Sequence, residues 1–272
     1  MALAADPDNS ELHRLLALAL CDAGDPAGAI DAAERAVALR PAGPGSRMAL
    51  GIAHYRAKHY DSAVEHLSRS IALNPNEPTT HVWLAEALLK QVSSSFGAEI
   101  GRHSKLIDQA DHHGAEAIKL QPERAGGYLI RTKVQIYRKD AFRASHWVHQ
   151  AVALEPNNPV AHQLLGAIAQ ANGDTRAAAD HFVTAGKLNP RSDASMHMLK
   201  GLRGGIPIGA IALFFLIRFI ITAGSAVGSA IGVIVVLALV IGLLWYWPRL
   251  RARRVMSPEA RRVLERDRQL RR

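Results

Sequence analysis

The chain has 272 residues, of which 49% are hydrophobic and 21% are charged, and its formal net charge is +9. This length and composition allow one or two domains with a sizeable core, and they exclude a disordered or collagen-like chain. The charge is unevenly distributed: residues 1–190 contain 19 basic and 20 acidic side chains, whereas residues 248–272 contain ten arginines and three acidic residues. Basicity therefore belongs to a short tail, and we expect no nucleic-acid-binding domain.

The cysteine content and the N-terminal residues lack the features typical of a secreted protein. Cys21 is the single cysteine, so the chain forms no internal disulfide and has no multi-cysteine zinc site. The N-terminal residues MALAADPDNS include neither a basic region nor a long apolar run, so we expect no secretory signal peptide. Arginine outnumbers lysine by 25 to 8, which is typical of a bacterial source of high GC content.

Prolines recur at a fixed interval over residues 1–190. They follow short apolar runs and stand at Pro7, Pro41, Pro75, Pro122, Pro156 and Pro190, with spacings of 34, 34, 47, 34 and 34. Turn residues at Gly24-Asp25, Lys58-His59 and Gly173-Asp174 divide the intervals into two helical segments each. The period predicts five complete helical hairpins after a partial one, with an insertion in the third.

Three positions of each repeat hold only small residues, as expected where helices approach closely. They are Ala17, Gly51, Ala85, Thr132 and Gly166, then Ala29, Ala63, Ala110, Ala144 and Ala178, then Ala36, Ser70, Ala117, Ala151 and Ala185. This pattern and the 34-residue period resemble the tetratricopeptide repeat, TPR. The resemblance implies an all-α solenoid of stacked hairpins over residues 1–190. The chain departs from the family pattern at the usual tryptophan position, which holds His13, Arg47, His81, Tyr128 or His162, and at Arg131, where a leucine is usual.

Two further segments accompany the repeats. The insertion, at about residues 91–104, is expected to form a loop that serves as a contact point or as a disordered spacer. Residues 191–205 are expected to form a capping helix, with Met196 and Leu199 on one face, and a linker.

The TPR resemblance also implies a groove, lined by the first helix of each repeat, in which a peptide or a partner helix binds. Projection of that face gives Arg14, Leu18, Met48, Ile52, Tyr55, Val82, Glu86, Leu129, Lys133, Tyr137, Gln163 and Gln170. For each of these residues, the alternative is ordinary solvated helix surface.

Residues 206–247 form a 42-residue apolar block whose one charged residue is Arg218. A single helix of this length would be ~63 Å long, about twice the ~30 Å hydrocarbon core, so the block predicts two transmembrane helices, at about 206–222 and 227–247. Trp245, Tyr246 and Trp247 form an interfacial aromatic cluster. Arg218 is expected to reach toward the interface; the alternatives are a polar contact inside an oligomer or with a membrane partner, or a re-entrant segment.

Basic residues flank both ends of this block, and basic flanks favour the cytoplasmic side. We therefore expect a multi-pass protein of the bacterial inner or plasma membrane, with the repeats and the C-terminus in the cytoplasm. Ser257-Pro258-Glu259 predicts the start of a C-terminal helix within the Arg-rich tail 248–272. Its narrow apolar stripe either lies on anionic lipid or belongs to a charged tail that fixes topology.

No recognisable chemistry accompanies these features. Several of the thirteen histidines share repeat positions, and none completes a recognisable metal-ligand pattern; the chain has no HExxH, GxSxG or phosphate-binding glycine motif. We therefore expect no enzyme activity, cofactor, metal or nucleic-acid partner. The sequence favours a membrane-anchored scaffold that binds a protein partner and contacts lipid. One alternative is a membrane-complex subunit recognised through its transmembrane hairpin, with the repeats as a regulatory arm; another is a histidine-dependent metal protein or enzyme.

Overall fold

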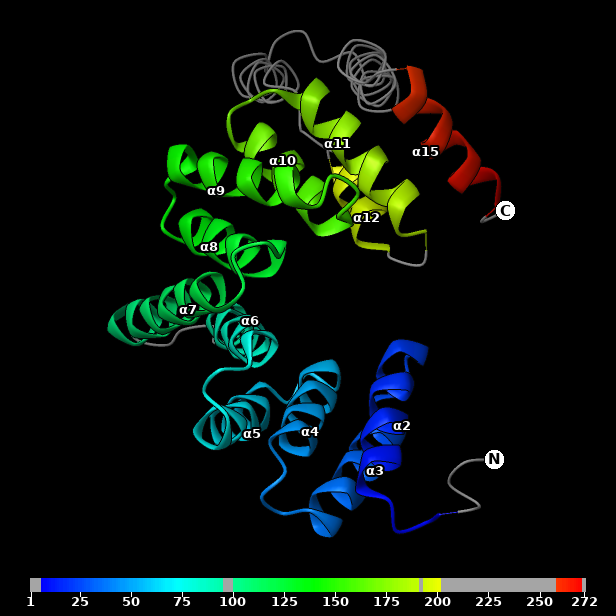
Figure 1. Ribbon diagram of the computed structural model, residues 1–272. Helices are drawn as coiled ribbons and strands as arrows, with labels where there is room; N and C mark the ends of the chain where they lie inside the picture. The colour runs from blue at the N-terminus through cyan, green and yellow to red at the C-terminus, as the bar shows by residue number, and fades with distance from the viewer. Residues whose placement is uncertain (1–5, 95–99, 191–192, 202–257, 271–272) are drawn as a thin grey trace, which may run out of the picture. The chain divides into compact units, whose positions relative to one another are not determined.

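The computed structural model describes residues 6–94, 100–190, 193–201 and 258–270, and all regular secondary structure in these ranges is helical (Figure 1). The helices are α2 (Ser10–Ala23), α3 (Pro26–Leu39), α4 (Pro44–Arg56), α5 (Tyr60–Leu73), α6 (Pro78–Ser94), α7 (Ile100–Leu120), α8 (Ala125–Tyr137), α9 (Ala141–Leu154), α10 (Pro159–Ala171), α11 (Thr175–Leu188), α12 (Asp193–Gly201) and α15 (Pro258–Leu270). The chain forms two compact units, Met1–Pro156 and Asn157–Arg272. The boundary falls between the fourth and fifth hairpins.

Prolines and asparagine or aspartate caps set the ends of the helices. Each second helix ends two residues before a repeat proline, at Leu39, Leu73, Leu120, Leu154 and Leu188. Helical geometry is disfavoured for the residue that precedes proline, so the chain must leave the helix there. At the start of α2, the Asn9 side chain accepts hydrogen bonds from the backbone N–H groups of Glu11 and Leu12, which satisfies donors that have no partner within the helix.

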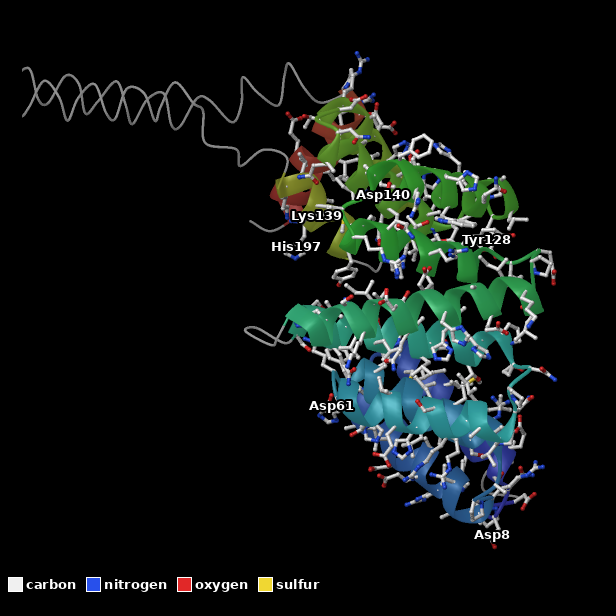
Figure 2. All side chains as sticks on the ribbon, turned by 90° about the vertical axis from the view of Figure 1, so that its left-hand side faces the viewer. Asp8, Asp61, Tyr128, Lys139, Asp140 and His197 are labelled. Atoms are coloured by element: carbon white, nitrogen blue, oxygen red, sulfur yellow. The ribbon has the colours of Figure 1, made fainter. Side chains whose placement is uncertain are left out.

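The turns inside the hairpins use a left-handed residue at one repeat position. Its φ angle is 82° at Gly24, 65° at Lys58, 59° at Lys139 and 81° at Gly173. The predicted turns at Gly24, Lys58 and Gly173 are therefore confirmed, and Lys139 adds the turn of the fourth repeat. Figure 2 shows Lys139 and Asp61 toward one edge of the first unit, and Tyr128, at the start of α8, toward the other.

The small repeat positions allow the two helices of each hairpin to pack closely. A Cβ atom added to Gly51 would lie 2.6 Å from Leu67 Cγ, and one added to Gly166 would lie 2.3 Å from Phe182 Cε1. Where the small residue is polar, it is buried with a partner: Ser70 Oγ donates to the Pro44 carbonyl at 2.8 Å. The predicted close approach between helices is therefore present at these positions.

The third hairpin corrects the expected loop at residues 91–104. Helix α6 is 17 residues long and α7 is 21, whereas the other repeat helices have 13 or 14 residues. Most of the insertion therefore lengthens the two helices of the hairpin, and residues 95–99 lie outside the described part. Extension of an existing helix adds a hydrogen bond for each residue without a new nucleation step, so it costs less than ordering a separate loop.

In the first unit, the first helices of neighbouring repeats pack on one another: α2 on α4, α4 on α6, and α6 on α8. Helices α4, α6 and α8 also pack on the second helix of the preceding repeat, α3, α5 and α7 respectively (Figure 1). The main core cluster lies in repeats two to four, where Leu67, Leu84, Leu88, Ile130 and Val134 are at most 3% exposed. The side chains of α2, α4, α6 and α8 thus form one continuous surface, named here the inner surface.

The second unit ends with two helices that pack on α11. The expected capping helix is present as α12, which contacts α11 and places Met196 against the core cluster of this unit. The expected tail helix is also present as α15, but its apolar stripe does not face outward. Ala260 and Leu264 are buried with Phe182 and Val183, so these two residues of the stripe do not lie on lipid, which was one of the two alternatives for this helix.

The predicted transmembrane segment 206–247 lies outside the described residues, together with Arg218, Trp245, Tyr246 and Trp247. Among the helices that the structure does describe, none is both long enough and apolar enough to cross a bilayer.

Candidate functional site

The predicted partner-binding residues lie on the first helices of the repeats, as expected. Ten of them share the inner surface, on α2, α4, α6 and α8 of the first unit, whereas Gln163 and Gln170 lie on α10 of the second unit. The structure therefore brings together the ten residues of the first unit.

Aromatic rings from neighbouring repeats meet on the inner surface. Tyr55 of α4 and Trp83 of α6 make an edge-on contact, with ring centroids 5.3 Å apart and an interplanar angle of 69°. The Arg56 guanidinium lies 5.5 Å from the centre of the Trp83 ring, within cation–π range. Met48 and Trp83 pack against the same buried residues, which include Ile52 and Ala53. Burial raises the pKa of the Tyr55 phenol, so this hydroxyl stays protonated at neutral pH. We name Met48, Tyr55, Arg56 and Trp83 the aromatic cluster.

Polar contacts continue this surface from α6 to α8. Lys133 of α8 forms an ion pair with Glu86 of α6, and both side chains are mostly buried. The Tyr137 hydroxyl donates to the Leu89 carbonyl at 3.2 Å, while 39% of the Tyr137 surface remains exposed. The two charges offset each other, so this part of the surface presents an aromatic ring and hydrogen-bonding groups without a net charge.

The remaining predicted residues divide into core and surface. Ile52 and Leu129 are only 5% and 8% exposed, so they belong to the core and offer little area to a partner. Leu18 and Val82 are half-buried and pack on the core clusters. Arg14 pairs with Glu11, and the hydrogen bond from Arg14 lowers the pKa of that carboxyl.

Projection of one helical stripe from the sequence missed Trp83 and Arg56. Trp83 lies one residue beyond the predicted Val82, and Arg56 one residue beyond Tyr55. The sequence signal that could have found them was a tryptophan and an arginine next to the predicted stripe, because both residue types are enriched at binding surfaces.

Two histidines at one repeat position contact the proline that precedes their repeat. The Nε2 atoms of His13 and His81 lie 2.8 and 2.9 Å from the carbonyl oxygens of Pro7 and Pro75, six residues earlier. His81 also lies 3.0 Å, Nδ1 to Nδ1, from His113 of the paired helix. Within the described residues, no group of three or more His, Cys, Asp or Glu side chains is arranged to hold a metal ion.

Comparison with known proteins identifies the repeats. Family models described as tetratricopeptide repeat match residues 2–45 and 46–77. The chain contains tetratricopeptide repeats. No curated protein matches the sequence.

Solved structures agree with this assignment of the fold. A thermophilic TPR protein of Thermus thermophilus, TTC0263, is 20% identical, with a TM-score of 0.65 over 71% of this chain and 99% of that chain. The human IFIT1 dimer with m7Gppp-AAAA is 22% identical, with a TM-score of 0.61 over 74% of this chain and 48% of that chain. Pseudomonas aeruginosa PilF is 18% identical, with a TM-score of 0.52 over 74% of this chain and 85% of that chain. At these identities the similarity shows a shared TPR fold alone. TPR proteins are generally scaffolds for protein–protein interaction without enzyme activity.

Proposed function

We propose that this protein is a membrane-anchored TPR scaffold that holds a protein partner, as a peptide or a helix, on the inner surface of its first four repeats. The observation that supports this most strongly is the aromatic cluster, in which Tyr55 and Trp83 from adjacent repeats meet beside Arg56. Tyrosine, tryptophan and arginine are enriched among the few residues that dominate binding energy at protein interfaces, because they bury large areas and retain hydrogen-bonding groups. The proposal assigns the protein no reaction.

The chemistry of the inner surface favours a peptide or helix with both apolar and polar side chains. Tyr137 is partly exposed, and Lys133 and Glu86 on the same surface neutralise each other. A strongly acidic or basic partner would find little complementary charge there, because Arg14 and Arg56 are also paired, with Glu11 and Asp22 respectively. We therefore propose a partner anchored by aromatic or aliphatic side chains.

The second half of the proposal is anchorage in the bacterial inner or plasma membrane, with the repeats and the C-terminus in the cytoplasm. It rests on the sequence: the apolar block 206–247 is long enough for two spans, and basic residues flank both of its ends. Anchorage would keep the inner surface close to the bilayer and raise the effective concentration of a membrane-associated partner.

Photo-crosslinking in native membranes tests the binding surface. A photoreactive amino acid replaces Tyr137 on the inner surface, and a matched probe replaces Glu34, which is exposed on the second helix of the first repeat. We expect a discrete protein adduct at position 137 and none at position 34. The Trp83→Ala substitution should remove the adduct, because it deletes the larger ring of the aromatic cluster.

The control for this experiment is Arg69→Ala, which alters an exposed residue on the second helix α5 and should leave the adduct unchanged. Identical diffuse labelling at positions 137 and 34 would contradict the inner-surface proposal and favour recognition through the transmembrane hairpin. Extraction of the membranes with alkaline carbonate tests anchorage separately, and release of the protein into the supernatant would contradict it.

A further inference from the structure

The chain leaves the second unit after α12 and rejoins the same unit at α15. Helix α12 ends at Gly201 and α15 begins at Pro258, and α15 contacts both α11 and α12 (Figure 1). Ala260 is fully buried and Leu264 is 3% exposed, and both belong to a cluster with Phe182 and Val183 of α11. The residues on either side of segment 202–257 are thus held on one folded unit.

An ion pair and the repeat architecture strengthen this contact. Lys187, in the last turn of α11, pairs with Glu259, in the first turn of α15. Helix α12 begins three residues after Pro190, as α4 begins three residues after Pro41 and α10 three residues after Pro156. Helix α12 therefore occupies the register of the first helix of a sixth repeat, and α15 adds a second helix to this end of the unit.

We propose that α15 acts as a return clasp, which fixes both ends of segment 202–257 to the same side of the membrane. The inference rests on the proposed membrane anchorage. If the apolar block 206–247 crossed the bilayer once, α15 would lie on the opposite side from α11. Ala260 and Leu264 could not then pack on Phe182 and Val183. The clasp therefore requires an even number of crossings, which places the C-terminal helix with the repeats.

The contact between α15 and α11 does not depend on the charges that flank the block. The positive-inside rule predicts orientation from arginine and lysine counts, whereas the clasp depends on apolar packing between described helices. The clasp also gives the apolar face of α15 a partner within the protein. Arg262 and Arg266, on the other side of the helix, remain exposed.

Site-directed cysteine labelling of the full chain in bacterial membranes tests the number of crossings. In a Cys21→Ser background, single cysteines replace Asp61 in the repeats, Gly224 within the apolar block, and Arg266 in α15. Sealed inverted vesicles and intact spheroplasts are treated with a membrane-impermeant maleimide. We expect Asp61→Cys and Arg266→Cys to react only in inverted vesicles, and Gly224→Cys only in spheroplasts. Reaction of Arg266→Cys from the side opposite to Asp61→Cys would overturn the proposal.

A cross-link tests the clasp itself, in the same membranes. Lys187→Cys and Glu259→Cys are combined in the Cys21→Ser background and treated with a short bis-maleimide, and the intramolecular product is measured by mass spectrometry. Leu264→Asp should abolish the product because it places a charge in the buried cluster, whereas Arg262→Asp, at an exposed position, should retain it. Absence of the product from the parent protein would overturn the clasp.

The two parts of the proposal fail in distinguishable ways. Release of the protein by alkaline carbonate, with the cross-link intact, would overturn anchorage and with it the membrane topology, but would leave the contact between α11 and α15 standing. Retention in the membrane without the cross-link would overturn the clasp and leave the proposed anchorage standing.

Discussion

In the first, third and fourth repeats, one residue near the start of the first helix links the repeat to the proline that precedes it. His13 and His81 make this link through Nε2, and the Tyr128 hydroxyl donates to the Pro122 carbonyl at 3.1 Å, again six residues earlier. A carbonyl oxygen only accepts, so the side chain must bring an N–H or O–H donor. This requirement accounts for histidine and tyrosine at the position where the TPR pattern usually has tryptophan, which is also a donor.

The histidine pair of the third repeat makes the protein sensitive to acid. Because His81 Nε2 donates to the Pro75 carbonyl, the Nδ1 atom of neutral His81 accepts, and His113 Nδ1–H donates to it. Burial, with the charges of His81 and His112, lowers the pKa of His113 from 6.5 to about 4, and nearby Glu116 acts in the opposite direction. Between these two pH values the unfolded chain binds the proton more readily than the folded chain does. Stability is therefore complete above about pH 6.5 and falls as the pH is lowered toward 4.

We expect the free energy of unfolding to fall by about 1 kcal/mol from this residue between pH 7 and pH 5, because solvent around the partly exposed ring weakens the effect. His113→Gln should remove this part of the pH dependence, because an amide still donates to His81 but does not titrate. Urea unfolding of the full-length protein in mild detergent, followed by circular dichroism at both pH values, measures the effect. His149→Gln, at an exposed position of α9, is the matched control. Equal pH dependence in the parent and in His113→Gln would contradict this assignment.

At the level of the helical hairpin, the turn between the two helices contains one residue with a left-handed backbone conformation, and either glycine or lysine occupies this position. Gly24 and Gly173 have no Cβ atom, whereas Lys58 and Lys139 adopt left-handed φ angles of 65° and 59° although they have a Cβ atom. For a residue with a Cβ atom, this conformation places the Cβ too close to the following carbonyl oxygen. The second and fourth hairpins therefore contain local strain that the first and fifth avoid.

Lys58→Gly and Lys139→Gly should each stabilise the protein by about 0.5–1 kcal/mol, because relief of strain exceeds the added entropy of the unfolded glycine. Gly24→Ala and Gly173→Ala are the converse variants. A Cβ at either glycine meets no atom within 4 Å, so any loss of stability there reports backbone strain and not a clash. Thermal unfolding of the four variants measures the effects. Destabilisation by Lys58→Gly would show that the lysine side chain contributes more than the strain costs.

At the scale of the whole molecule, the proline period predicted the number and pairing of the repeat helices, since each proline imposes a local stop that needs no tertiary information. The lengthening of α6 and α7 was not predictable in this way, because serines are typical of loops. In the structure Ser93 and Ser94 belong to α6, where their hydroxyls donate to the Lys90 and Gln91 carbonyls. The residues predicted to bind a partner lie on the first helices of the repeats, but the prediction omitted Trp83, because a one-residue rotation decides which side chains share a face. The burial of Leu264 depends on a contact with Phe182, more than 80 residues away in sequence.

A solenoid gives the same residue a different role at its end and in its middle. Leu16 and Leu84 occupy one repeat position, but Leu16, in the first repeat, is 37% exposed and lines a surface hollow with His13 and Ala32. Leu84, in the third repeat, is 3% exposed and lies in the main core cluster with Leu67 and Ile130. Each repeat contacts only its neighbours, so a repeat with one neighbour leaves part of its interface uncovered.

Leu84→Ala should therefore cost about 2–5 kcal/mol, as is typical of a cavity in a packed core, whereas Leu16→Ala should cost less than about 1 kcal/mol. Urea unfolding of the full-length variants in mild detergent gives the two free energies. Hydrogen exchange measured by mass spectrometry shows which helices each substitution destabilises. In Leu84→Ala, loss of protection should extend through α5, α6, α7 and α8, the helices that share the cluster. An equal cost for the two substitutions would mean that the face of the first repeat is covered by another protein segment in solution, and protection of α2 from exchange in the parent protein would then identify where it binds.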